Sequence, residues 1–133
     1  MPGTERWRGR WRTAKASALL CWARLLIAWI PFDRWRGTLG FDGPVRLSDA
    51  RRHAAVVEWA ARRLPFAFKC LPRAMALSWI LRRKRLGHTV VFAVRPAQLR
   101  NSADSLHAWV EVGGTTLIGE LPGPWLETLR LGV

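Results

Sequence analysis

The chain has 133 residues, of which 22 are Lys or Arg and 9 are Asp or Glu, so its formal net charge is +13. Half of the residues are hydrophobic and only two are Cys, which excludes a disordered basic tail, collagen and a disulfide-rich mini-protein. A small, Trp-rich globular protein remains, and its charge indicates an anionic partner: nucleic acid, a membrane surface or an acidic polypeptide.

The most apolar stretch, residues 16–32, predicts a helix that ends at Pro31. Arg24 in its middle, with no small-residue cleavage site after it, argues against a signal peptide or a spanning helix. We expect one stripe to cover the core: Leu19, Trp22, Ala23, Leu26, Ile27 and Ile30. The alternative is a Trp- and Arg-rich helix that lies on a membrane or on another protein. The expected location is cytoplasmic, with peripheral membrane contact through this helix as the alternative.

Two helices are predicted after a connection rich in Gly and Pro at residues 37–44. Ser48 and Asp49 indicate the start of the first, which runs over residues 50–64 with apolar residues every three or four positions. Cys70-Leu71-Pro72 opens the second, since Pro is favoured in a first turn. We expect it to end near residue 85, with Gly87 as its C-cap.

The periodicity then changes to that of strands. Residues 89–94 predict a buried strand, and residues 106–112 and 115–120 predict a hairpin around the turn Gly113-Gly114. After two prolines, the last residues are predicted to form a short helix. We predict an α+β fold: one domain over residues 1–133, with a helical segment at 1–45 and a core at 46–133. In that core a central helix packs on a small antiparallel sheet.

Cys70 is the strongest candidate nucleophile. It lies at a predicted helix start, where free N–H groups and the helix dipole stabilise a thiolate. Most lone Cys residues are small buried hydrophobes, and Cys21, in the middle of an apolar helix, fits that description.

His107 is the candidate base, although a lone His on a strand is more often structural. Alternation puts it on one strand face with Trp109 and Glu111. Counting back from the two-residue turn places it opposite Glu120, with Cβ atoms about 5 Å apart. Cys70, His107 and Glu120 would then be nucleophile, base and orienting group. Weaker candidates for the third position are Asp104, Glu111 and Glu127.

No metal and no nucleotide cofactor is expected, because no His, Cys, Asp and Glu cluster has metal-site spacing and no Gly-rich phosphate loop occurs. A basic nucleic-acid-binding protein is an alternative on charge and Trp content. The Arg residues are scattered over the predicted helices without a recognisable binding motif, so no specific nucleic acid is expected.

Three segments resemble the lasso-peptide leader peptidases of the transglutaminase-like cysteine protease superfamily: Cys70-Leu71-Pro72-Arg73-Ala74, Leu81-Arg82-Arg83 and His107-Ala108-Trp109-Val110-Glu111. Similar features precede them at Ala23-Arg24-Leu25, Pro31, Trp35 and Leu39-Gly40, so the resemblance covers most of the chain. It implies a transglutaminase-like, papain-like core with Cys70 and His107 as catalytic residues. The third residue is usually Asp in this family; the matching position is Gly119, and Glu120 follows it.

The resemblance also implies a function and partners. Such a cysteine peptidase removes the leader region from a ribosomally synthesised precursor peptide during lasso peptide maturation. A separate leader-binding recognition protein would present the precursor, and an ATP-dependent macrolactam synthetase would close the ring. Two alternatives stay open: a non-catalytic transglutaminase-like scaffold, and another transferase or amidase that uses the same Cys and His.

Overall fold

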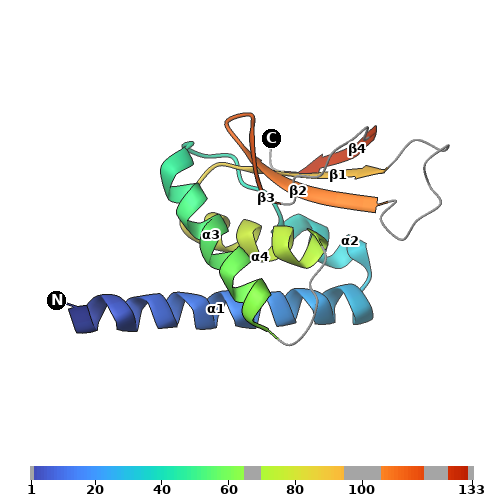
Figure 1. The fold of residues 1–133 in the computed structure, drawn as a ribbon. Helices are drawn as coiled ribbons and strands as arrows, with labels where there is room; N and C mark the ends of the chain where they lie inside the picture. The colour runs from blue at the N-terminus through green and yellow to red at the C-terminus, as the bar shows by residue number, and fades with distance from the viewer. Residues whose placement is uncertain (1, 65–69, 95–105, 119–125, 132–133) are drawn as a thin grey trace.

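The computed structural model describes residues 2–64, 70–94, 106–118 and 126–131 (Figure 1). Four α-helices and a 3-10 turn come first, followed by four strands. The helical part comprises α1 (Pro2–Trp29), α2 (Phe32–Trp35), η1 (Arg36–Thr38), α3 (Leu47–Arg63) and α4 (Cys70–Arg83). The strands are β1 (Thr89–Val94), β2 (Leu106–Val112), β3 (Thr115–Ile118) and β4 (Leu126–Leu131).

The strands form one sheet in the order β3-β2-β1-β4, and each described pair is antiparallel. The sheet covers α4, and α1 lies on the other side of α4 (Figure 1). The predicted α+β fold, with a central helix on a small antiparallel sheet, is therefore confirmed. Gly113 and Gly114 form the predicted two-residue turn, with φ values of +56° and +83° that suit a type I′ hairpin.

The C-terminal segment is a strand, so the prediction of a short helix was wrong. β4 pairs with the edge of β1 that β2 leaves free, and it satisfies the backbone groups of that buried strand. The register shifts between Phe92 and Ala93, which are paired with Leu129 and Glu127. Because of this bulge, Glu127 and Leu129 lie on opposite faces of the sheet although they are two residues apart.

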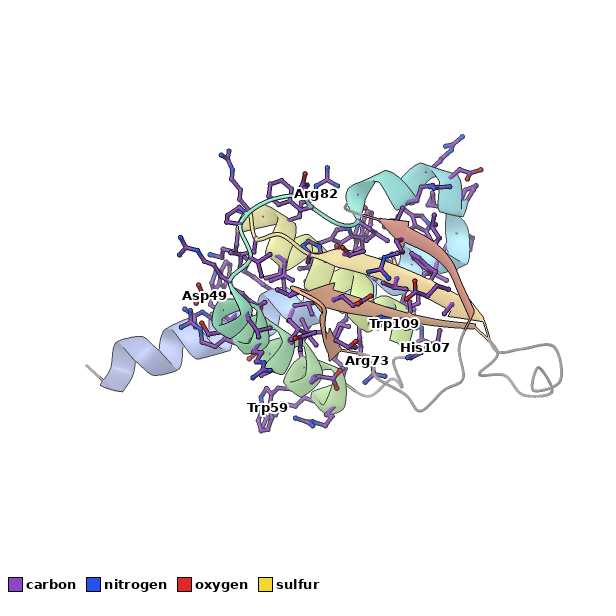
Figure 2. All side chains as sticks on the ribbon, turned by 90° about the horizontal axis from the view of Figure 1, so that it is seen from above. Asp49, Trp59, Arg73, Arg82, His107 and Trp109 are labelled. Carbon is purple, nitrogen blue, oxygen red and sulfur yellow. The ribbon has the colours of Figure 1, made fainter. Side chains whose placement is uncertain are left out.

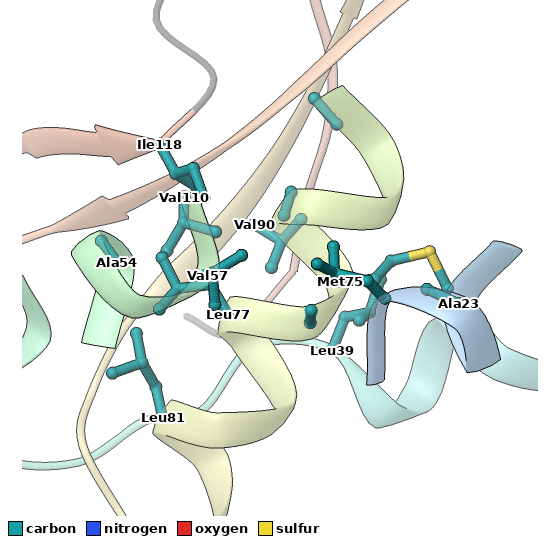
Figure 3. Packing of buried hydrophobic residues seen from close by; sticks show 14 of the residues in the cluster. Ala23, Leu39, Ala54, Val57, Met75, Leu77, Leu81, Val90, Val110 and Ile118 are labelled. Carbon is teal, nitrogen blue, oxygen red and sulfur yellow. The ribbon is translucent and has the colours of Figure 1, made fainter. Parts of the chain in front are cut away.

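Helix α4 lies at the centre of the core. Ala74, Met75, Ala76, Leu77 and Leu81 are completely buried, because α4 packs against α1, α3 and β2. Figure 3 shows Met75 beside Ala23 and Leu39, and Leu77 beside Val57. Fully burying a side chain of this size contributes about 1.5–3 kcal/mol, so this packing fixes where the ends of α4 lie.

The prediction for the apolar stripe of α1 was right in part. Ala23 is fully buried, and Leu19 and Leu26 pack against the core. Trp22, Ile27 and Ile30 are exposed instead of buried. Ala16 and Leu20, which were not in the predicted stripe, are fully buried, so the contact face is turned toward them. Among the described helices, none is long and apolar enough to cross a membrane.

The end of α4 was also predicted at the wrong residue. Arg85, with a φ of +57°, takes the left-handed position, and the N–H of Leu86 donates to the carbonyl of Leu81 at 2.9 Å. Gly87 is not the C-cap, and a glycine is required there for a steric reason. A Cβ on Gly87 would lie 2.2 Å from the carbonyl oxygen of Gly43, which belongs to the connection before α3.

A buried hydrogen-bond chain connects α4 to the beginning of β1. The N–H of Gly40 donates to Ser78 Oγ at 2.8 Å, and Ser78 lies 2.7 Å from Nε2 of His88. Nδ1 of His88 lies 2.9 Å from the carbonyl of Leu86, which can only accept. His88 is therefore neutral with its proton on Nδ1, and Ser78 donates to Nε2. Burial is the main reason that the pKa of His88 lies below its ordinary value, and Arg82 adds to it.

Replacing Gly87 by Ala should lower the free energy of unfolding by about 1–3 kcal/mol, because backbone atoms must move to admit the new methyl group. Urea denaturation measures the loss. Gly37→Ala is the control, since a Cβ at Gly37 would meet nothing within 4 Å. Its effect should stay within about 0.5 kcal/mol. Equal stability of the two variants would contradict the close approach at Gly87.

The neutral state of His88 predicts that stability falls in mild acid. Its native pKa lies below the ordinary 6.5, so the unfolded chain binds a proton that the native chain does not. The stability that neutral His88 contributes to the folded state is fully present above about pH 6.5 and is lost as the pH falls below that value. NMR titration should give His88 a pKa below 6.5 and the Nδ1–H tautomer. A native pKa above 6.5, or stability that rises as the pH drops from 7.5 to 6, would contradict this prediction.

Candidate active site

Cys70 is the first residue of α4, as predicted. The following residues explain why a helix starts there: Pro72 lies in the first turn, where its missing N–H costs nothing, and the buried run from Ala74 onward fixes the helix. The N–H groups in the first turn of a helix have no partner within the helix, and such a position favours a thiolate. The Cys70 side chain itself lies outside the described residues.

An ion pair fixes the first turn of α4 to α3. Nη1 of Arg73 lies 3.1 Å from both carboxylate oxygens of Glu58, and each side chain is about seven-tenths buried. Arg73 follows Cys70 by three residues, so the pair lies within one helical turn of the candidate nucleophile. Its position restrains the helix start rather than supplying a proton.

The strand that carries His107 begins near the start of α4. Helix α4 packs against β2, and the two elements start on the same side of the molecule (Figure 1). The view from above agrees: Arg73, in the first turn of α4, and His107, the second residue of β2, are labelled close together (Figure 2). Cys70 and His107, which are 37 positions apart in the chain, therefore both lie at the end of the molecule where α4 and β2 begin.

The face of strand β2 on which His107 lies follows from its neighbours in the strand. Ala108, Val110 and Val112 belong to the core cluster under the sheet. Alternation therefore puts His107 on the opposite face of β2, as predicted, together with Trp109 and Glu111. His107 is nevertheless only 2% exposed. The His107 side chain therefore lies on the sheet face that is turned away from α4, and the distance between Cys70 and His107 stays untested because the Cys70 side chain is outside the described residues.

A polar network continues from His107 along its sheet face. The rings of His107 and Trp109 are 5.8 Å apart between centroids, and Nε1 of Trp109 donates to Glu111 Oε2 at 3.3 Å. Glu111 also pairs with Arg130 of β4 at 3.1 Å, and Arg130 pairs with Glu127 at 2.9 Å. The hydrogen bond that Arg130 donates to Glu127, assisted by Glu111, raises the pKa of Arg130 above its ordinary value. The network holds the Trp109 ring beside His107.

Only part of this network could be found from the sequence. Trp109 and Glu111 were indicated, because alternation along the strand grouped them with His107. Arg130 gave none, because its segment was predicted to be helical. Only the pairing of β4 with β1, which places Arg130 opposite Val91, brings it next to the β2 side chains.

The count that led to Glu120 was wrong in one step. Val112 and Thr115 are opposite each other as expected, but the register then shifts, and Val110 pairs with Ile118 instead of the residue before it. A bulge therefore separates the turn from the rest of β3. Glu120 itself lies outside the described residues, so its role as the third member stays a prediction. The same holds for the alternative Asp104.

Within the described part of the chain, no group of three His, Cys, Asp or Glu side chains is arranged to hold a metal ion. His88 and His53 are accounted for elsewhere: the first is bound in the buried chain with Ser78, and the second lines a basic cleft near the end of α4. Cys21, a free thiol, is half-buried on α1. Cys70 and His107 remain the predicted nucleophile and base.

Glu111→Gln should cost about 1 kcal/mol of unfolding free energy, because it weakens the ion pair with Arg130 at a side chain that is only 17% exposed. Glu127→Gln is the matched control on the same Arg130. The Glu127 side chain is 46% exposed, so its substitution should change stability by less than about 0.5 kcal/mol. Chemical denaturation of both variants decides the comparison. A larger loss for Glu127→Gln would show that the network depends on β4 rather than on β2.

Comparison with known proteins identifies the family of the chain. Searches among curated proteins and among solved structures give no significant match. A family model described as the transglutaminase-like superfamily matches residues 18–127, which include α3, α4, the hairpin and both candidate residues. The chain therefore belongs to the transglutaminase-like superfamily.

Proposed function

We propose that this protein is a cysteine peptidase that removes the leader from a ribosomally synthesised precursor peptide during lasso peptide maturation. The observation that carries the proposal is the placement of Cys70 at the start of a buried helix whose beginning lies beside the beginning of the His107 strand. The superfamily includes cysteine peptidases, and the segments around both residues resemble the leader peptidases.

In the proposed reaction, His107 takes the thiol proton of Cys70 and the thiolate attacks the carbonyl carbon at the leader–core junction. The backbone N–H of Cys70 donates to the oxyanion of the tetrahedral intermediate, since it lies at a helix start. The intermediate collapses to a thioester while His107 protonates the leaving amine of the core peptide. Water, deprotonated by His107, hydrolyses the thioester, which releases the leader carboxylate and restores the thiol.

Two further residues support His107 in this proposal. Trp109, held by Glu111, packs against one side of the imidazole and limits its rotation. Glu120 would accept a hydrogen bond from the second imidazole nitrogen and favour the tautomer that leaves the first one free for Cys70. Trp109 is thus a positioning residue, and Glu120 is the proposed orienting carboxylate.

The proposal includes partners. The precursor leader would be presented by a separate leader-binding protein, and an ATP-dependent macrolactam synthetase would use the freed N-terminus. The face of α1 that exposes Trp22, Leu25 and Trp29 is available for such a protein or for a membrane surface. These three residues are three and four positions apart, so they lie on one side of the helix, and none of them belongs to the described core.

The reaction is tested by incubating the protein with a precursor peptide and its leader-binding protein, and by reading the products by mass spectrometry. Cys70→Ala should abolish cleavage, and His107→Asn should reduce it by about a hundredfold or more. Cys21→Ala is the matched control, since it removes the other thiol and should leave cleavage unchanged. Retained cleavage by a folded Cys70→Ala protein contradicts the assignment.

The activated state of Cys70 is tested separately by alkylation with iodoacetamide in the Cys21→Ala background. A thiolate at a helix start should react at a pH well below 8.5, the usual pKa of a free thiol. His107→Asn should shift the reactivity profile to higher pH. An unshifted profile together with uncleaved precursor would favour the non-catalytic scaffold.

A further inference from the structure

A cleft of about 670 Å³ lies at the end of α4 that is opposite to Cys70. It is bounded by α1, by the beginning of α3 and by the last turn of α4 with the residues that follow. Asp49, one of its lining residues, is labelled far from His107 (Figure 2). Since 14 residues of helix span about 20 Å, the cleft is separate from the candidate active site.

The lining of the cleft is strongly positive. Six of its side chains are cations: Arg12, Lys15, Arg46, Arg52, Lys84 and Arg85. Asp49 is the one carboxylate among the described lining residues, and it is already paired with Arg52 at 2.7 Å. The surplus of positive charge in a concave site concentrates the potential and attracts anions.

The same cleft contains apolar surface. Val56, Ile80 and Leu86 line it from three different parts of the chain, and Trp11 lies at its edge with 65% of its surface exposed. The volume is within the range of pockets that enclose a ligand of drug size, which corresponds to a few residues of peptide. Aliphatic lining surrounded by cations fits a ligand that carries both carboxylates and aliphatic side chains.

The pKa of His53 reflects the positive electrostatic potential inside the cleft. Burial lowers its pKa below the ordinary 6.5, and the nearby charges of Lys84, Arg12 and Arg52 lower it further, opposed only in part by Asp49. These groups come from each of the three helices around His53. The imidazole is therefore neutral near pH 7, and an anion placed in the cleft would favour its protonation.

We propose that this cleft is a docking site for an acidic peptide segment in which carboxylates alternate with aliphatic residues. In an extended segment, alternate side chains point to opposite sides, so carboxylates reach the cations while aliphatic groups reach Val56, Ile80 and Leu86. Binding uses none of the groups at Cys70 and His107. The inference stands without the proposed peptidase activity and adds a recognition site to the fold.

Other anionic partners fit the cleft less well. A single-stranded nucleic acid needs an extended basic channel with several stacking aromatic rings, and Trp11 is the one aromatic ring other than His53 among the described lining residues. A membrane is flat, whereas these cations surround a hollow. Charge together with aliphatic lining therefore favours a peptide.

The test uses a short fluorescein-labelled peptide in which Glu alternates with Leu, and fluorescence anisotropy with the full chain. The Glu peptide should bind at low salt and weaken as salt is added, and a peptide with Gln in place of Glu should bind at least tenfold more weakly. The double variant Arg12→Glu/Lys84→Glu should weaken binding by about tenfold or more. Arg51→Glu/Arg62→Glu is the control, because it makes the same charge change at exposed α3 positions outside the cleft.

A second measurement needs no substitution. NMR titration of His53 should show its pKa rising when the Glu peptide is added, with no change for the Gln peptide. An unchanged His53 pKa, or equal losses in the cleft and control variants, overturns the proposal. So does a cleft-dependent preference for oligothymidylate or for phosphatidylserine vesicles over the Glu peptide. Iodoacetamide reactivity of Cys70 should be the same in both double variants, which separates this site from the proposed catalysis.

Discussion

The burial of α4 is the constraint on which the other features depend. The helix has neighbours on several sides, α1, α3 and the sheet, and its middle consists of small or aliphatic residues that exclude water. A helix enclosed in this way cannot slide or rotate without opening a cavity, so its two ends are held in place. The Arg73–Glu58 pair and the Ser78–His88 chain add polar restraints at two points along it.

Both fixed ends of α4 favour an anion, but for different reasons. At the start, free N–H groups and the positive end of the dipole favour an anion, and Cys70 is placed there beside the His107 strand. At the other end, Lys84 and Arg85 join cations of α1 and α3 around a cleft. One buried helix therefore separates a site suited to a thiolate from a site suited to an anionic ligand. The high net charge belongs in part to the second site and has no direct role in the first.

Several features could be predicted because they depend on local pattern. Alternation in β2 grouped His107, Trp109 and Glu111, and two glycines with positive φ marked the hairpin. The errors arose where a register shift or a close contact intervened. A bulge between β2 and β3 displaced the count toward Glu120, and the segment predicted as a short helix after the two prolines pairs with β1 as a strand. Gly87 is required by the backbone of Gly43, far from it in sequence, and no local rule indicates such a contact.

The sequence by itself determined the classes of the long helices and of the first three strands, the α+β order and the two candidate residues, since helix starts, periodicity and turns depend on neighbouring residues. Tertiary structure decided how far the buried face of α1 is turned: it buries Ala16 and Leu20 and leaves Trp22 and Ile27 exposed, because the positions of α3 and α4 determine which side of α1 is covered. It also placed Arg130 beside Glu111 through the pairing of β4 with β1. Finally, it gathered cations from three helices into one cleft, because charges distant in sequence meet only when the core brings their helices together.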